Sequence, residues 1–222
     1  MQPMTTSLGD LARANPSSTR VFLRHRLDFC CGGRHTLAEA CERAGLDPAA
    51  IAAELEREAA RGDAPPSWEA RSQTELADHI ESYYHAALRR DLPPLIEAAR
   101  KVERVHAGKP GVPAGLADVL TLFFSEMQIH MAKEEQVLFP MIRRGARGEA
   151  LYMPVRVLES EHDAHREALE RIRAITDDLQ LPERACATWT ALYHGLVAIE
   201  ADLMQHIHLE NNILFSRATH AA

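Results

Sequence analysis

Apolar side chains recur every three or four residues along most of the chain, whereas alternating runs of β-branched residues are scarce. Ala, Leu, Glu and Arg, which favour helices, fill much of the sequence between them. The pattern therefore predicts an all-α protein. Its first part contains short segments separated by proline and glycine, and we expect helices at residues 8–14, 18–26, 36–44 and 48–61.

Four longer amphipathic segments follow, at residues 72–106, 113–144, 153–179 and 182–216. The first opens on Ser72-Gln73-Thr74-Glu75, a capping-box pattern, and we expect it to bend or break at Pro93-Pro94. Long amphipathic helices with short connections predict an antiparallel four-helix bundle. Because glycine and proline cluster at residues 62–66, we predict an N-terminal helical domain at residues 1–62, a linker at 63–71 and the bundle at 72–222.

Two of the long segments carry the same fourteen-position pattern, at residues 126–139 and 202–215: acid-x-x-x-His-x-x-x-Glu-x-x-(Val/Ile)-Leu-Phe. Residues four apart on an α-helix share a face and lie about 6 Å apart along its axis. Each pair, His130 with Glu134 and His206 with Glu210, can therefore bind one metal ion, or its carboxylate can bridge two ions. The apolar triplets at 137–139 and 213–215 follow directly, so we expect these histidine and glutamate side chains to face the core. Polar groups without a partner are costly there, and a metal ion would be their natural partner.

The other two long helices each offer one histidine in an apolar context, His85 and His162. A set of imidazoles and carboxylates without thiolates suits a pair of iron ions better than a structural zinc ion. We therefore predict a di-iron centre held by six side chains: His85, His130, Glu134, His162, His206 and Glu210.

Four further residues lie near these predicted ligands in sequence. Glu126 and Asp202 come one turn before the ligand histidines of the repeat. They could accept an imidazole N–H or relay protons, or they could belong to a solvated face. His165 is the strongest candidate for an additional ligand, and Tyr84 is interpreted as a core residue.

Composition narrows the possible partners and location of the protein. The chain contains 12 histidines, and its formal net charge is -7 without a long basic run. This charge disfavours binding to nucleic acid or to an anionic membrane. The chain has neither an apolar run of spanning length nor a recognisable leader, and its four cysteines are too few for a disulfide framework. We therefore expect a cytoplasmic protein.

The adjacent residues Cys30 and Cys31 form the most unusual feature of the N-terminal part. Their Cα atoms must lie about 3.8 Å apart, closer than an ordinary disulfide tolerates, so a bond between them would be strained and readily reduced. Gly32 and Gly33 let a partner or a metal approach the backbone. The pair could transfer electrons, hold iron transiently or dock a client protein. Cys41 and Cys186 are expected to be small buried apolar residues.

Several motifs together resemble one known family over essentially the whole chain. They are Asp28-Phe29-Cys30-Cys31-Gly32-Gly33, Lys101-Val-Glu-Arg-Val-His106, His130-Met-Ala-Lys-Glu134-Glu-Gln-Val-Leu-Phe-Pro140, Glu159-Ser-Glu-His162-Asp163 and His206-Ile-His-Leu-Glu210-Asn-Asn. The family is that of the iron-sulfur cluster repair di-iron proteins, also called repair of iron centres proteins.

This resemblance implies a small domain with a vicinal cysteine pair, followed by a hemerythrin-like four-helix bundle. It implies two non-haem iron ions bridged by oxo and carboxylate groups, and it places the ligands of the family on the six residues predicted above. It also implies repair of iron-sulfur clusters damaged by nitrosative or oxidative stress, with the protein acting as an iron donor. Reduction of nitric oxide to nitrous oxide is a further activity proposed for the family.

One departure from the oxygen-carrying hemerythrins bears on function. Those proteins have a His-x-x-x-His pair on one helix, but here the positions four residues before and after His162 are Leu158 and Arg166. Fewer protein ligands leave open metal positions, which favours turnover of small ligands or release of iron over oxygen carriage.

Three functions remain open at this stage. The protein could be an iron donor for damaged or apo iron-sulfur proteins, an enzyme that reduces nitric oxide, or a non-catalytic module that senses or stores oxygen, nitric oxide or iron. The cysteine-containing domain favours the first, because neither a gas reductase nor an oxygen carrier has an evident need of it. A homodimer is also compatible with the sequence.

Overall fold

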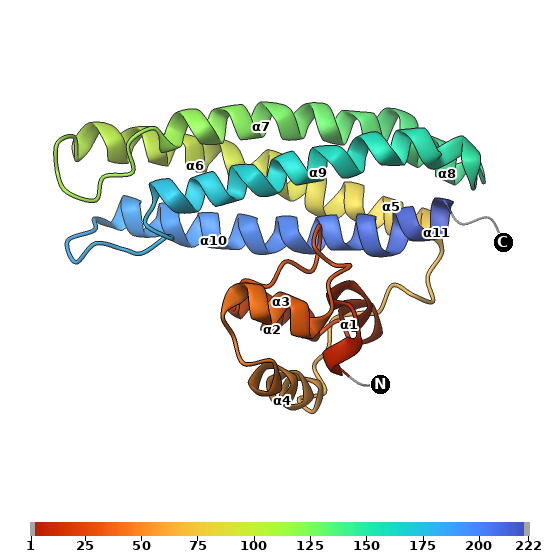
Figure 1. Cartoon of the computed structure of the whole chain (residues 1–222). Helices are drawn as coiled ribbons and strands as arrows, with labels where there is room; N and C mark the ends of the chain where they lie inside the picture. The colour runs from red at the N-terminus through yellow and green to blue at the C-terminus, as the bar shows by residue number, and fades with distance from the viewer. Residues whose placement is uncertain (1–2, 220–222) are drawn as a thin grey trace.

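The computed structural model describes residues 3–219, which fold as a small group of helices packed beneath a long helical bundle (Figure 1). The predicted all-α class is confirmed. Within the described range, β-structure is limited to one bridge between Ser7 and Thr36. No helix in this range is both long enough and apolar enough to cross a membrane.

The N-terminal helices follow the capping signals of the sequence. They are the short 3₁₀ turn η1 (Pro3–Thr5), α1 (Leu8–Ala14), α2 (Ser18–Arg24), α3 (Leu37–Ala44) and α4 (Pro48–Ala59). Thr36 and Glu39 form a capping box at the start of α3, and α4 begins with Asp47 as its cap and Pro48 as its first residue. Helix α2 ends two residues earlier than predicted, ahead of Arg26, which has a φ of 55°.

Apolar burial and one ion cluster stabilise this N-terminal part. Phe22 and Phe29 are fully buried together with residues from the four helices. The carboxylate of Glu58 on α4 is buried and forms ion pairs with Arg20 and Arg24 of α2, which ties the two helices together.

The remaining elements build the bundle. They are α5 (Gln73–His79), η2 (Ile80–His85), α6 (Ala86–Val105), α7 (Leu116–Lys133), η3 (Glu134–Leu138), α8 (Phe139–Arg143), α9 (Glu149–Ile175), α10 (Ala187–His208), η4 (Leu209–Phe215) and α11 (Ser216–Thr219). Helix α6 packs against both α7 and α10, and α7 packs against α9. The chain reverses direction between successive long helices, so the predicted antiparallel bundle is confirmed (Figure 1).

We expected a bend or a break at Pro93-Pro94, and a break is wrong, because both prolines lie inside the continuous helix α6. The apolar residues Leu88, Leu92 and Ile96 on either side of the prolines are buried in the bundle core, and this packing holds the two halves of the helix together. The carbonyl groups that lose their helical partners belong to Arg89 and Arg90, which are exposed, so water can satisfy them.

The bounds of two other helical segments also differ from prediction. Helix α9 begins at Glu149, four residues earlier than expected, and contains Pro154. It ends at Ile175 because residues 177–179 have positive φ angles. Helix α10 begins only at Ala187 and the helical segment continues through α11 to Thr219.

Three segments of the bundle, η2, η3 and η4, are π-helical. A π-helical turn is wider than an α-helical turn and occurs frequently at functional sites. All three lie near the boundary between two hydrophobic clusters. One contains Leu92, Phe123 and Leu203, and the other contains Ile80 and Leu214. The helices therefore widen between two packed ends of the bundle.

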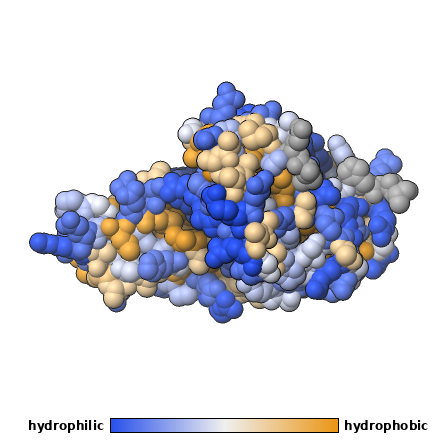
Figure 2. Space-filling view, turned by 90° about the horizontal axis from the view of Figure 1, so that it is seen from below, coloured by the Kyte–Doolittle hydropathy of each residue, from blue (hydrophilic) through white to orange (hydrophobic). Residues whose placement is uncertain are grey.

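The N-terminal domain approaches the bundle closely at Asn212. The Asn212 side-chain amide donates to the carbonyl oxygens of Phe29 and Cys30, at 3.1 and 3.3 Å. A Cβ atom at Gly9 or Gly33 would lie 2.6 or 2.9 Å from Asn212 Oδ1, so this approach requires glycine. Figure 2 shows this side of the molecule, where hydrophobic side chains remain visible on the bundle beside the domain.

Candidate metal centre

The structure brings the six predicted ligands together in the middle of the bundle. Each is at most 1% exposed, and they come from all four long helical segments. His85 is the last residue of η2, Glu134 is the first residue of η3, and Glu210 lies in η4. His130, His162 and His206 project from α7, α9 and α10.

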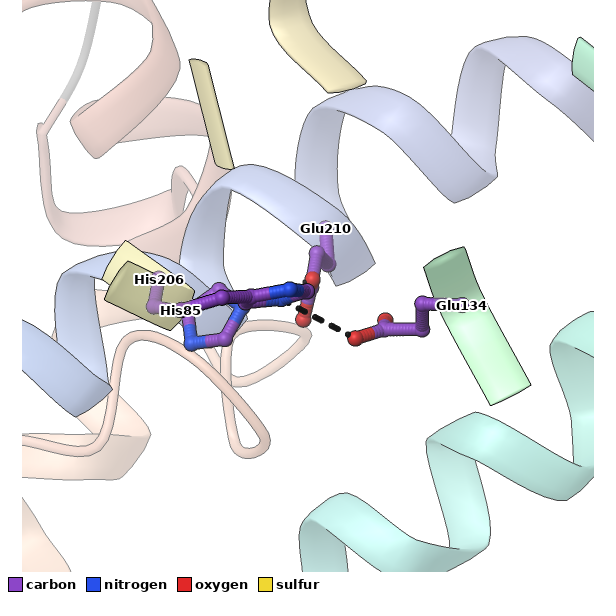
Figure 3. Close-up of side chains that lie close together, drawn as sticks. All are labelled: His85, Glu134, His206 and Glu210. Atoms are coloured by element: carbon purple, nitrogen blue, oxygen red, sulfur yellow. Dashed lines mark hydrogen bonds and ion pairs between the residues drawn. The ribbon is translucent and has the colours of Figure 1, made fainter. Parts of the chain in front are cut away.

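One half of the cluster contains His85 and His206, whose Nε2 atoms lie 3.2 Å apart. Glu134 Oε2 is 3.3 Å from His85 Nε2, and Glu210 Oε1 is 2.8 Å from His206 Nε2. Figure 3 shows these four side chains pointing toward one another. They form the first of two groups that could hold a metal ion, here called subsite A.

The other half, subsite B, contains His130 and His162 with the same two carboxylates. The two Nε2 atoms are 3.1 Å apart. Glu134 Oε2 also lies 3.5 Å from His130 Nε2, while Glu210 Oε2 is 3.2 Å from His162 Nε2. One oxygen of Glu134 therefore faces both subsites, and Glu210 turns one oxygen toward each.

This arrangement fits a pair of cations. Two imidazole nitrogens bound about 2.1 Å from one ion at a right angle would lie about 3 Å apart, close to both observed separations. Among the described residues, neither oxygen of Glu134 accepts a hydrogen bond, and Glu210 Oε2 also lacks one. Burying such oxygens without a partner is costly, so the protein core is incomplete without positive charge at this position.

The electrostatics of the cluster favour neutral imidazoles at His85 and His130 and one ionised carboxylate. Burial, followed by the nearby charge of Glu210, raises the pKa of Glu134 well above its usual value. Burial acts in the same direction on Glu210, but His206 and His162 outweigh it and hold the Glu210 pKa well below its usual value. Burial also lowers the pKa of His85 to about 4, which keeps the imidazole in its metal-binding form.

Hydrogen bonds from outside the cluster orient three of the histidines. His85 Nδ1 donates to Glu135 at 2.7 Å, and His130 Nδ1 donates to Glu161 at 2.9 Å. His162 Nδ1 lies 2.8 Å from the side-chain oxygen of Asn211. Because a carboxylate can only accept, the proton sits on Nδ1 and the Nε2 lone pair faces the cluster.

Aromatic rings stack on three of the ligand histidines. Phe139 stacks on His85 at 5.8 Å between ring centroids, and Phe215 stacks on His162 at 5.9 Å. The phenylalanine of each sequence repeat thus packs on a ligand from another helix. Tyr84 is buried and stacks on His206, so it is a core residue that also contacts a predicted ligand. Val137, which was expected to face the core, is 48% exposed.

The predicted hydrogen-bonding role of Glu126 is not supported, because its side chain is exposed and His130 Nδ1 instead faces Glu161. Four residues of an α-helix turn through about 400°, so Glu126 is rotated by about 40° from His130, toward solvent. Asp202 is half-buried, and burial raises its pKa. It does not accept from His206, whose Nδ1 has no hydrogen-bond partner within the described chain.

The residues that do orient the histidines were not among those predicted from the sequence. Glu135, Glu161 and Asn211 each stand next to a predicted ligand in the sequence. A polar residue next to a ligand on a helix points toward the neighbouring helix. Their position next to a ligand in the sequence could therefore have identified these three residues.

Two expectations about other residues need correction. His165 is buried against His130, with ring centroids 4.8 Å apart, but it belongs to neither subsite formed by the described residues. Cys41 is fully buried, as expected. Cys186 is only half-buried, and its sulfur lies 3.3 Å from His106 Nε2 at the start of α10.

Replacing Glu161 with glutamine is expected to weaken metal binding by about 10- to 100-fold, because a neutral acceptor makes His130 a poorer ligand. Glu126→Gln is the matched control, since this exposed glutamate on α7 is expected to contribute nothing. Anaerobic competition with a chelator of known affinity measures both variants. Equal affinities in the two variants would contradict this role for Glu161.

The bundle and its buried histidine and glutamate side chains define a hemerythrin-like cation-binding protein. The family model described as the hemerythrin HHE cation binding domain matches residues 76–218, and a second model, described as a domain of unknown function (DUF542), matches residues 4–59. The chain belongs to the hemerythrin family and, within it, to the family of the iron-sulfur cluster repair protein YtfE.

The relatives that show this are similar over nearly the full length of both chains. The iron-sulfur cluster repair protein YtfE of Citrobacter koseri is 47% identical over 211 residues, which cover 95% of each chain. The protein of the same name from Escherichia coli O157:H7 has the same identity and coverage. That from Yersinia pseudotuberculosis is 47% identical over 212 residues, or 96% of each chain.

Proposed function

We propose that the bundle holds two iron ions, one in subsite A and one in subsite B. Glu134 and Glu210 would bridge them, together with the oxo group that the family resemblance implies. The donor set supports this proposal, because four imidazoles and two shared carboxylates without thiolates suit paired iron.

We further propose that the protein repairs damaged iron-sulfur clusters in the cytoplasm by supplying this iron to damaged or apo iron-sulfur proteins. The observation that carries the proposal is the small number of protein donors. Two six-coordinate ions need about twelve donor atoms, whereas four nitrogens and four carboxylate oxygens are at hand. A site that leaves positions open favours release of its cargo, and the relatives are named for the same cellular task.

The loop that carries Cys30 and Cys31, between α2 and α3, supports donation rather than simple storage. It is here called the cysteine loop. Cys31 Sγ lies 3.6 Å from the carbonyl oxygen of His162, and the Asn211 side chain contacts both His162 and the carbonyl oxygen of Cys30. The loop is therefore in direct contact with residues around subsite B. A protein that only stored iron would not need this contact.

The test is an anaerobic transfer experiment. The protein is loaded with iron, and the iron per chain is counted. It is then mixed with an apo iron-sulfur protein, sulfide and a thiol, and the absorbance of the cluster is followed against an equal amount of free iron. We expect faster cluster assembly than with free iron, together with loss of iron from the protein. Retention of both ions without cluster assembly would contradict donation.

Reduction of nitric oxide to nitrous oxide is the second candidate function. The observation that favours it is that Glu134 Oε2 faces both subsites. Two ions bound there would be close neighbours, and each could hold one small ligand beside the other. The bundle residues would position these ligands in a buried, dry site. Nitrous oxide released by the reduced protein under anaerobic nitric oxide would support this candidate, and its absence would exclude it.

A further inference from the structure

A second group of potential metal ligands lies outside the bundle core. Asp28, Cys30 and Cys31 each offer one ligand atom, and these atoms all lie within 4.8 Å of one another. The two cysteines are free thiols, with their sulfur atoms 3.9 Å apart. Asp28 Oδ1 is 3.2 Å from Cys30 Sγ.

These separations fit a single thiophilic cation. Two sulfurs bound at about 2.3 Å in a tetrahedral arrangement lie about 3.8 Å apart, which matches the observed distance between the two cysteines. The backbone N–H groups of Cys30 and Cys31 donate to Asp28 Oδ1, so the carboxylate is held beside the thiols. A Cβ atom at Gly32 would lie 3.1 Å from Asp28 Oδ2, and glycine therefore keeps this side of the carboxylate clear.

The group is open to solvent on one side. It lies on the wall of a cleft of about 840 Å³ between the N-terminal domain and helices α9 and α10. Cys30 is buried, whereas Asp28 and Cys31 are half-buried and face this cleft. Arg166 of α9 also lines this cleft, and its positive charge interacts electrostatically with Asp28 and Cys31.

On its other side, the group contacts subsite B, through the contact of Cys31 with the His162 carbonyl and the link through Asn211. We propose that Asp28, Cys30 and Cys31 form a second cation site, through which ferrous iron passes between the buried cluster and the cleft. This inference rests on the proposed function as an iron donor and names the route of the cargo.

The transfer balances without an added oxidant or reductant. The bonds from iron to His130, His162, Glu134 and Glu210 would break as bonds to the two sulfurs and an Asp28 carboxylate oxygen form. The bridging oxo group would take up two protons and leave as water, and the iron would remain ferrous throughout. Each thiol that binds loses one proton to water in the cleft. The fourth position faces the cleft, where a client protein can supply the next ligand.

Cobalt(II) is the probe for the site, because thiolate ligation gives a near-ultraviolet charge-transfer band that imidazole and carboxylate ligands do not give. The full-length protein, loaded anaerobically with ferrous iron, is titrated with cobalt. The test variant is Cys30→Ser/Cys31→Ser. The matched control is Cys41→Ser/Cys186→Ser, which removes the same number of thiols elsewhere.

We expect the wild type and the control to show the band and to bind one more cobalt ion per chain than the test variant. Asp28→Asn should weaken this binding by about tenfold. A circular dichroism melt and an iron count establish that the test variant is folded and loaded. Absence of the band from the wild type, or its persistence in the test variant, would overturn the site.

A second measurement tests the route. Release of iron to a strong ferrous chelator is expected to slow by about tenfold in the Cys30→Ser/Cys31→Ser variant and to be unchanged in the control. Equal release from both would overturn the route. The readouts are independent of cluster assembly, so a protein that binds cobalt at these cysteines but builds no cluster would refute the proposed donation and leave the cation site standing.

Discussion

Replacing Glu134 with glutamine is expected to reduce the iron content from about two ions per chain to less than one. Glu134 Oε2 lies within 3.5 Å of a histidine nitrogen in each subsite, so the substitution removes a charged ligand from both ions at once. An amide oxygen is neutral and bridges metal ions poorly. Iron per chain is measured by colorimetric analysis after anaerobic loading and desalting.

The fold should survive this substitution. Glutamine has nearly the shape of glutamate, and it removes a carboxyl group that burial already disfavours as an anion. The metal-free variant is therefore expected to melt no lower than the metal-free wild type. Glu126→Gln, an exposed change on the same helix, should keep the full iron content. Full iron content in Glu134→Gln would refute the bridging role.

Removal of the metal from the wild type is expected to lower the melting temperature by about 10 °C. An ion present at about 1,000 times its Kd stabilises the folded state by about 4 kcal/mol, and 1 kcal/mol corresponds to about 2–4 °C for a chain of this size. The physical reason is the set of buried carboxylate oxygens that otherwise lack partners. Calorimetry with and without a chelator measures the difference.

Hydrogen exchange should locate this loss of stability. Backbone amides of η2, η3 and η4, which carry His85, Glu134 and Glu210, are expected to exchange faster in the metal-free protein than in the loaded protein. In Glu134→Gln, the chelator should leave the melting temperature nearly unchanged, because little metal remains to be removed. Equal melting temperatures for the loaded and the metal-free wild type would contradict this prediction, because they would show that the six buried side chains need no metal for stability.

The repeat explains why part of the site could be predicted. The spacing from His130 to Glu134 and from His206 to Glu210 places each pair on one helical face, and the following apolar residues show which face is buried. His85 and His162 lack such a partner in their own helices. They became candidates because each stands in an apolar context on its own helix.

Other features depend on contacts between helices, which local patterns do not encode. Pro93 and Pro94 predicted a break, but the buried apolar residues around them hold the helix together. The partners of the histidines at Glu135, Glu161 and Asn211 depend on how far each helix is rotated in the bundle. The π-helical turns also leave no mark in a periodicity that assumes 3.6 residues per turn.

A π-helical turn contains one residue more than a regular α-helical turn. Deletion of one residue in η4 would restore regular α-helical geometry, and the residues beyond it would keep nearly their present directions, because the wide turn already absorbs the extra residue. Phe215 would stay close to the ring of His162, whereas residues inside the turn, Glu210 among them, would move relative to His206. The extra residue therefore serves the position of the ligand and not the packing of the downstream core. A deletion in these segments should lower the metal content more than the stability of the metal-free protein.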